Sequence, residues 1–262
     1  MRDLTRREFV AATVGAPMVA LAGSEAGLAG SEVAAGIGRP GSLLDPRLTA
    51  RPHRPSRPTE VGESRFGTDL ARGGFLYVPS SYTASVPAPL IVALHGSGGR
   101  AATWSSLQES CDARGIVLLA PDSRGRTWDR VNGDFGPDVG FIDSALRYTF
   151  DRCVIDPGHI ALAGFSDGAS YALSLGPSNG DLFTHLIAWS PGFSDPAEPI
   201  VGLPEVFVSH GTVDPVLPVS GSRNGIVPMF EMDGYDIEYA EFDGLHEVPP
   251  EMTTRALDWF LD

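Results

Sequence analysis

Short apolar runs alternate with segments of helical spacing from about residue 73 to the end of the chain. The runs of strand length are Phe75–Val78, Leu90–Leu94, Ile116–Ala120, Ile160–Ala163, Leu186–Trp189, Val206–Ser209 and Ile237–Phe242. The segments with helical spacing include Ala101–Ala113, Asp138–Phe150, Asp167–Leu175 and Pro250–Leu261. This alternation predicts one α/β domain whose mostly parallel sheet is flanked by helices. In such sheets the functional residues gather at the carboxyl ends of the strands.

The first residues have a different pattern. Residues 5–10 read Thr-Arg-Arg-Glu-Phe-Val, which resembles the twin-arginine export motif. The apolar stretch that follows ends at Ala22 and is shorter than the roughly 20 residues that span a bilayer. We therefore predict a signal peptide over residues 1–22, cleavage near Ala22, and a periplasmic or extracellular protein. A chance arginine pair before a short core helix is the alternative.

Residues 23–61 are rich in Gly, Ala, Ser, Pro and Arg, and several prolines interrupt any helix or strand there. The sequence predicts a flexible linker over this range and a catalytic domain over residues 62–262.

The charge balance excludes several kinds of site. There are 19 basic and 33 acidic residues, a net charge of −14, and every basic residue is Arg. Without Lys the chain can form no lysine Schiff base and no P-loop phosphate site. The acidic excess argues against a nucleic-acid partner. No apolar run is long enough to predict a membrane span in the mature chain.

A nucleophile motif follows the strand that ends at Ala163. Gly164-Phe165-Ser166-Asp167-Gly168 is G-x-S-x-G between a predicted strand and a predicted helix, the context this motif requires. The tight turn presents the Ser166 hydroxyl at a helix N-terminus, where developing negative charge is stabilised. The alternative reading is an ordinary helix-capping serine.

Serine needs a general base, and the base needs an acid to orient it. His246 lies after the last strand and before the last helix, which is the expected place for the base. His95 and His210 each precede a glycine at a strand end, where we expect contacts with loop backbone. Asp214 follows the strand that ends at Ser209, and Asp195 is the rival acid.

The order Ser166, Asp214, His246 is that of α/β-hydrolases and not of the major serine proteases. An oxyanion hole is expected beside Ser166, where backbone amides can reach a substrate oxygen. We assign its donors to the amides of Ser97, in the turn His95-Gly-Ser-Gly-Gly99, and of Asp167, with Gly96 as the alternative to Ser97.

Several longer stretches resemble bacterial α/β-hydrolase esterases of the phospholipase/carboxylesterase and polyhydroxybutyrate-depolymerase-like group. They are Leu94–Gly99, Ala120–Trp128, Gly136–Asp143, Gly164–Gly168, His210–Asp214 and Gly244–Pro249. The resemblance implies an α/β-hydrolase fold and hydrolysis of carboxylic esters with no metal or cofactor, on small-molecule or polymeric substrates. In this fold Cys111 and Cys153 are expected on opposite faces of the sheet, which argues against a disulfide.

The remaining expectations concern the pocket and the rival functions. The segment between Trp189 and Val206 is short and contains four prolines, so we expect no helical lid and no sizeable cap domain. Trp128, Trp189 and Phe193 are the candidate apolar walls of a shallow cleft, and ordinary core packing is the alternative for each, above all for Trp189 at a strand end. A shallow cleft favours acyl chains of about two to six carbons. A peptidase on the same fold and a non-catalytic binding protein are the alternative functions.

Overall fold

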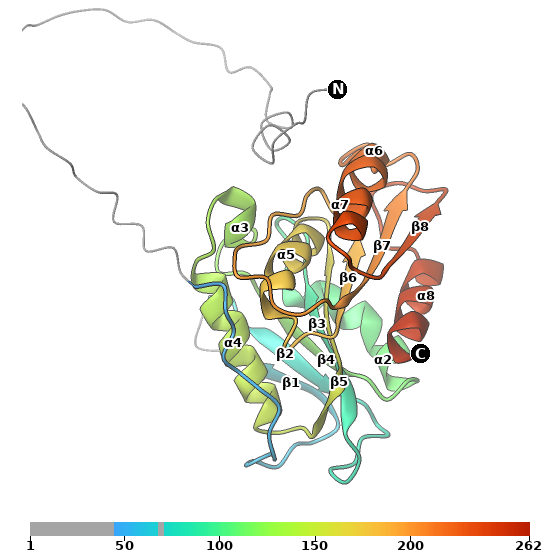
Figure 1. Ribbon diagram of the computed structural model, residues 1–262. Helices are drawn as coiled ribbons and strands as arrows, with labels where there is room; N and C mark the ends of the chain where they lie inside the picture. The colour runs from blue at the N-terminus through green and yellow to red at the C-terminus, as the bar shows by residue number, and fades with distance from the viewer. Residues whose placement is uncertain (1–44, 68–70) are drawn as a thin grey trace, which may run out of the picture. The chain divides into compact units, whose positions relative to one another are not determined.

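A single sheet organises the chain in the computed structural model, which describes residues 45–67 and 71–262 (Figure 1). Its strand order is β1-β2-β4-β3-β5-β6-β7-β8, with antiparallel pairing on both sides of β2 and parallel pairing from β4 to β8. The strands are β1 (Gly62–Phe66), β2 (Gly74–Val78), β3 (Ala88–Leu94), β4 (Val117–Pro121), β5 (Ile155–Phe165), β6 (His185–Trp189), β7 (Glu205–Gly211) and β8 (Ile237–Phe242).

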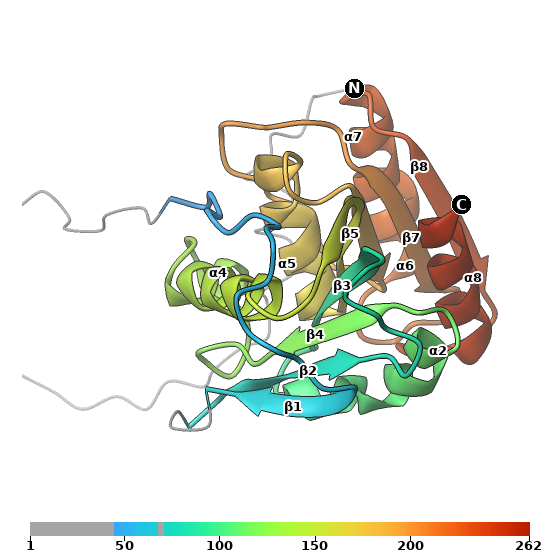
Figure 2. The same ribbon diagram turned by 90° about the horizontal axis from the view of Figure 1, so that it is seen from below.

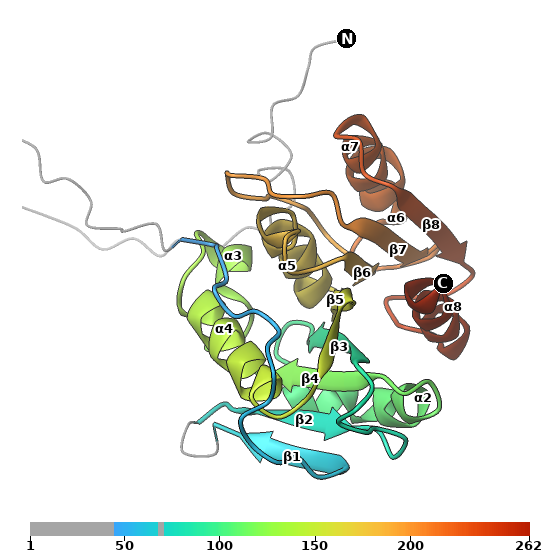
Figure 3. The same ribbon diagram turned by 60° about the horizontal axis from the view of Figure 1, so that its bottom comes forward.

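Helices cover both faces of the sheet, as Figures 2 and 3 show. One face carries α4 (Pro137–Phe150), α5 (Asp167–Leu175) and α7 (Val227–Met232). The other face carries η1 (Ala101–Leu107), α2 (Gln108–Asp112) and α8 (Pro250–Leu261). Shorter turns are α3 (Asp129–Asn132), η2 (Pro177–Asn179), α6 (Val219–Gly221) and η3 (Ser222–Ile226).

The central strands are continuous apolar runs because helices cover both faces of the sheet. Along β3, Leu90, Val92 and Leu94 pack into the core beneath α4 and α5. Ile91 and Ala93 pack into the core beneath α8. Because successive side chains of a strand point to opposite faces, a strand covered on both sides must be apolar throughout. Cys153 lies in the first core and Cys111 in the second, and both thiols are free, as expected.

All the strands and helices predicted from periodicity are present, with ends that differ by a few residues. The predicted helix over residues 101–113 is a 3-10 helix followed by α2. Sequence reasoning missed β1, whose residues are mostly polar and partly exposed because it is an edge strand. It also missed the short turns from α6 to α7. Residues 190–204 contain no helix, so the expected absence of a helical lid in that segment is confirmed.

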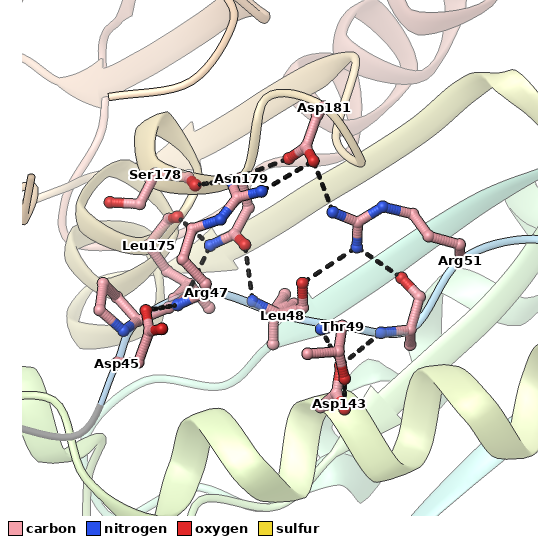
Figure 4. Close-up of polar contacts among 12 residues, drawn as sticks. Asp45, Arg47, Leu48, Thr49, Arg51, Asp143, Leu175, Ser178, Asn179 and Asp181 are labelled. Carbon is pink, nitrogen blue, oxygen red and sulfur yellow. Dashed lines mark hydrogen bonds and ion pairs between the residues drawn. The ribbon is translucent and has the colours of Figure 1, made fainter. Parts of the chain in front are cut away.

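The linker prediction for residues 23–61 is wrong where the structure describes them. Residues 45–57, which we call the N-terminal strap, contain no helix or strand and contact α4 and η2. Figure 4 shows the polar contacts of the strap from Asp45 to Arg51. Leu48 and Ala50 are each 2% exposed. The folded body therefore begins at or before residue 45, and not at Gly62.

Polar side chains distant in sequence accept hydrogen bonds from the backbone amides of the strap. The Leu48 amide donates to Asn179 Oδ1 at 2.8 Å. The Thr49 and Ala50 amides donate to Asp143 Oδ1 at 2.6 and 2.7 Å. Arg47 pairs with Asp181 at 2.8 Å (Figure 4). Prolines exclude helix and sheet interior but not an extended segment held by side-chain partners.

The predicted signal peptide, residues 1–22, and the predicted linker residues 23–44 lie outside the described residues. Within the described residues, no helix is both long enough and apolar enough to cross a membrane.

Candidate active site

Ser166 lies in the turn that joins β5 to α5. Its φ is 56° and its ψ is −119°, a strained conformation for a residue other than glycine. A Cβ on Gly164 would lie 2.2 Å from the carbonyl carbon of Gly168, and a Cβ on Gly168 would lie 2.1 Å from the Leu94 carbonyl oxygen. Both positions therefore require glycine, as the motif predicts.

The structure brings Ser166, His246 and Asp214 together from three strand ends. His246 Nε2 lies 2.8 Å from Ser166 Oγ, and His246 Nδ1 lies 2.6 Å from Asp214 Oδ2. Ser166 is 8% exposed, and the side chains of His246 and Asp214 are 13% and 0% exposed. The chain of contacts from hydroxyl to imidazole to carboxylate is the one that activates a serine nucleophile.

Asp214 is held as a carboxylate. Burial alone would raise its pKa. Hydrogen bonds from the Leu217 amide, from His246 and from the Val216 amide outweigh burial, and the pKa of Asp214 lies below its ordinary value. Both amides donate to Oδ1 at 2.8 Å. The charge that would stabilise an imidazolium at His246 is therefore in place at neutral pH.

The rival acid, Asp195, lies elsewhere. Its carboxylate forms an ion pair with Arg130, and its amide donates to Ser174 Oγ. The sequence favours Asp214 over Asp195 as the acid, and in the structure His246 contacts Asp214.

The turn that is predicted to contribute to the oxyanion hole passes beside Ser166. A Cβ on Gly96 would lie 3.4 Å from Ser166 Cβ, so this turn passes close to the nucleophile. The Gly98 amide donates to the Arg126 carbonyl and the Gly99 amide to the Gly96 carbonyl. Within the described residues the Ser97 amide donates to no backbone acceptor. Asp167 is the first residue of α5, so no acceptor within that helix reaches its amide. Both donors are available, and the Gly96 amide is still an alternative.

Two of the three predicted pocket walls belong to the core. Trp128 and Trp189 are 0% exposed. The Trp128 indole donates to the His95 carbonyl at 2.8 Å and packs against Tyr171, while Trp189 packs against Trp104. These two assignments are wrong, because both rings turn inward beneath the strand ends. Phe193 is half-buried and is still a candidate wall.

Sequence reasoning missed Phe165 as a site residue. Its half-buried ring lies 4.7 Å from the His246 ring, centroid to centroid. The signal was its place in G-x-S-x-G, directly before the nucleophile. Leu245, Val213 and Val216 add exposed aliphatic side chains on the loops that carry His246 and Asp214. Exposed apolar side chains therefore lie on both loops that carry the acid and the base of the triad.

Known proteins resemble this chain in sequence and in fold. Residues 91–260 match the alpha/beta hydrolase family. A probable feruloyl esterase C of Aspergillus oryzae is 31% identical over 159 residues, which cover 56% of each chain. Feruloyl esterase B of Thermothelomyces thermophilus is 33% identical over 135 residues, covering 48% of this chain and 44% of that one. The chain thus spans about half the length of these relatives.

The fold also matches a solved structure. The crystal structure of esterase PE8 superposes with a TM-score of 0.59 at 20% identity, covering 73% of this chain and 99% of that one. The layered sheet, its strand order and its helices therefore follow a known architecture.

Proposed function

The chain belongs to the α/β-hydrolase family, and we propose that it is a serine esterase that cleaves carboxylic esters through an acyl-enzyme. The observation that carries the proposal is the hydrogen-bonded series Ser166, His246, Asp214 beside the Ser97 and Asp167 amides. The feruloyl esterases among its relatives support the same reaction class.

In the first half of the proposed reaction, Ser166 Oγ attacks the ester carbonyl carbon while His246 Nε2 takes the hydroxyl proton. Asp214 keeps Nδ1 of His246 protonated and stabilises the imidazolium. The carbonyl oxygen becomes an oxyanion that the Ser97 and Asp167 amides bind. One such donor contributes on the order of 3 kcal/mol to transition-state stabilisation. The alcohol then leaves with the proton from His246.

In the second half, His246 removes a proton from water, and the resulting hydroxide attacks the acyl carbon. The same two amides bind the second oxyanion. Collapse of this intermediate returns the proton to Ser166 Oγ and releases the acid. The dipole of α5, whose N-terminus begins at Asp167, favours the negative charge in both steps.

The lack of a helix in residues 190–204 supports short acyl groups or small polyester-type substrates. The loop before α4 contains only the four-residue α3. A shallow cleft buries few methylenes, at about 0.8 kcal/mol each, so long acyl chains gain little. Phe165 and Phe193 are the aromatic side chains available to contact an acyl group.

Ester and amide turnover test the proposal directly. We expect the protein to hydrolyse p-nitrophenyl acetate, butyrate and hexanoate faster than the palmitate, and the matching p-nitroanilides far more slowly. Turnover of methyl ferulate, measured in the same series, tests whether the enzyme accepts aromatic acyl groups. Faster turnover of palmitate, or of the anilides, would contradict the proposed substrate class.

The nucleophile is tested by substitution. Ser166→Ala should abolish turnover and labelling by a fluorophosphonate probe, because the hydroxyl is the attacking group. Ser105→Ala, a change at an exposed serine of η1, is the matched control and should match the unsubstituted protein. Turnover by Ser166→Ala within tenfold of the control would refute the assignment.

For localisation, we propose that residues 1–22 direct export by the twin-arginine route, on the strength of the Arg6-Arg7 pair and the apolar stretch after it. Replacing both arginines by Lys should keep the protein in the cytoplasm of an expressing bacterium. An exported protein that still begins at Met1 would refute cleavage.

A further inference from the structure

A second histidine contacts the acid of the triad. His210, in β7, is 0% exposed. Its Nε2 lies 3.2 Å from Asp214 Oδ2 and 2.8 Å from the Leu217 carbonyl oxygen. Its Nδ1 lies 2.7 Å from Ser222 Oγ, at the start of η3. His210 therefore connects Asp214 to an element that contributes nothing else to the triad.

These contacts fix the tautomer of His210. Both neighbours of Nε2 are acceptors only: a carbonyl oxygen and a carboxylate whose pKa is lowered. The proton must therefore sit on Nε2. Nδ1 is then an acceptor, and the Ser222 hydroxyl donates to it. Burial lowers the pKa of His210, so the ring is neutral. Its Nε2–H donates to the Leu217 carbonyl and lies beside Asp214 Oδ2 without adding a charge.

Both oxygens of the Asp214 carboxylate thereby have polar neighbours. Oδ1 accepts the Val216 and Leu217 amides. Oδ2 accepts His246 Nδ1–H and lies 3.2 Å from His210 Nε2, whose proton also faces the Leu217 carbonyl. A carboxylate has about four lone-pair sites, so no further donor is needed. The two amides fix only one oxygen. His210 Nε2 lies against the other oxygen, Oδ2, which is also the oxygen that contacts His246.

We propose that His210 is a positioning residue of the triad: its Nε2–H, oriented by Ser222, holds Asp214 Oδ2 in line with His246 Nδ1. The inference rests on the proposed esterase function. His210 does not touch the substrate, so it acts on the chemical step through Asp214 and leaves substrate binding unchanged. A role in packing alone would affect the stability of the fold and would not depend on a donor at the Nε2 position.

Two amide side chains of different length separate these roles. The amide nitrogen of Gln reaches the position of Nε2, whereas that of Asn reaches only the position of Nδ1. We expect His210→Asn to lower kcat for p-nitrophenyl butyrate by about 10- to 100-fold, the cost of a misplaced catalytic group, with KM within about twofold. His210→Gln should restore kcat to within about fivefold, the value of one hydrogen bond.

His185 provides the matched control. It is a buried histidine at the opposite end of a neighbouring strand, β6, with no contact to the triad. His185→Asn and His185→Gln should both leave kcat unchanged. Thermal melting of every variant shows which are folded at the assay temperature.

If His210→Asn melts below that temperature, the Ser222→Ala variant tests the positioning role instead. This substitution removes the donor to Nδ1 that orients the His210 ring, and it should lower kcat by about fivefold at constant KM. The proposal is overturned if His210→Asn keeps the unsubstituted kcat, if Gln and Asn lose activity equally, or if Ser222→Ala has no effect. Failure of the unsubstituted protein to hydrolyse any ester would instead refute the proposed function.

Discussion

Gly168→Ala is the most direct test of the geometry around the nucleophile. The added Cβ would lie 2.1 Å from the Leu94 carbonyl oxygen and 2.6 Å from that of His95. An ordinary carbon–oxygen contact is about 3.3 Å. The end of β3 and the start of α5 must therefore separate by about 1 Å to accept one methyl group.

That separation acts directly on the oxyanion hole. Leu94 and His95 immediately precede the turn with the Ser97 amide, whereas Gly168 moves with the Asp167 amide and Ser166. One donor then loses its alignment with the oxyanion. A misplacement of about 1 Å can cost on the order of a hundredfold, similar to the loss of one oxyanion donor. We expect kcat for p-nitrophenyl butyrate to fall by about that factor.

The assay combines kcat with a fluorophosphonate titration that counts functional sites, and with thermal melting. Gly140→Ala is the control: Gly140 lies in α4, a Cβ there meets nothing within 4 Å, and the helix should gain about 0.5–1 kcal/mol. A folded Gly168→Ala protein with kcat within threefold of this control would refute the reasoning.

Three further outcomes are expected. Asp214→Asn should lower kcat about ten-thousandfold because the amide favours the wrong histidine tautomer, whereas Asp195→Asn should retain it; equal losses in a p-nitrophenyl ester assay would contradict the assignment. Burial lowers the pKa of His185 to about 4, against about 6.5 in the unfolded chain. Between about pH 6.5 and 4 only the unfolded state therefore takes up this proton. The free energy of unfolding should fall by up to about 3 kcal/mol over that range. His185→Gln should remove this loss in urea titrations; an unchanged pH dependence would contradict it. Leu48→Ala should destabilise the fold by about 2–5 kcal/mol in the same titration, and no change would mean that the strap is not part of the core.

Local patterns were enough to predict the sheet and the residues that meet at its edge. Apolar runs mark strands covered on both faces, and a motif at a strand end places its side chain at the carboxyl edge. Because Ser166, Asp214 and His246 each follow a strand of the same sheet, their order along the chain predicts that they meet at this edge. These inferences succeed because each depends on a few consecutive residues and on one rule of parallel sheets.

The features that the sequence did not predict depend on contacts between residues that are far apart in the chain. Trp128 can be a core residue because its indole N–H donates to the His95 carbonyl. No local sequence pattern shows on which side of a loop an aromatic ring will pack. His210 was expected to contact loop backbone, which it does through Leu217, but its contact with Asp214 needed the three-dimensional turn. The linker prediction for the strap came from its prolines and from the Gly, Ala, Ser and Arg content of residues 23–61.

The N-terminal strap also constrains the order in which the molecule can assemble. Its partners follow it at long sequence separations: 94 residues from Thr49 to Asp143 and 134 from Arg47 to Asp181. During synthesis these residues emerge long before anything can hold them, and such distant contacts form late in folding. Substitutions in the strap should therefore accelerate unfolding and leave the refolding rate nearly unchanged, which makes the strap a determinant of how long the native state persists.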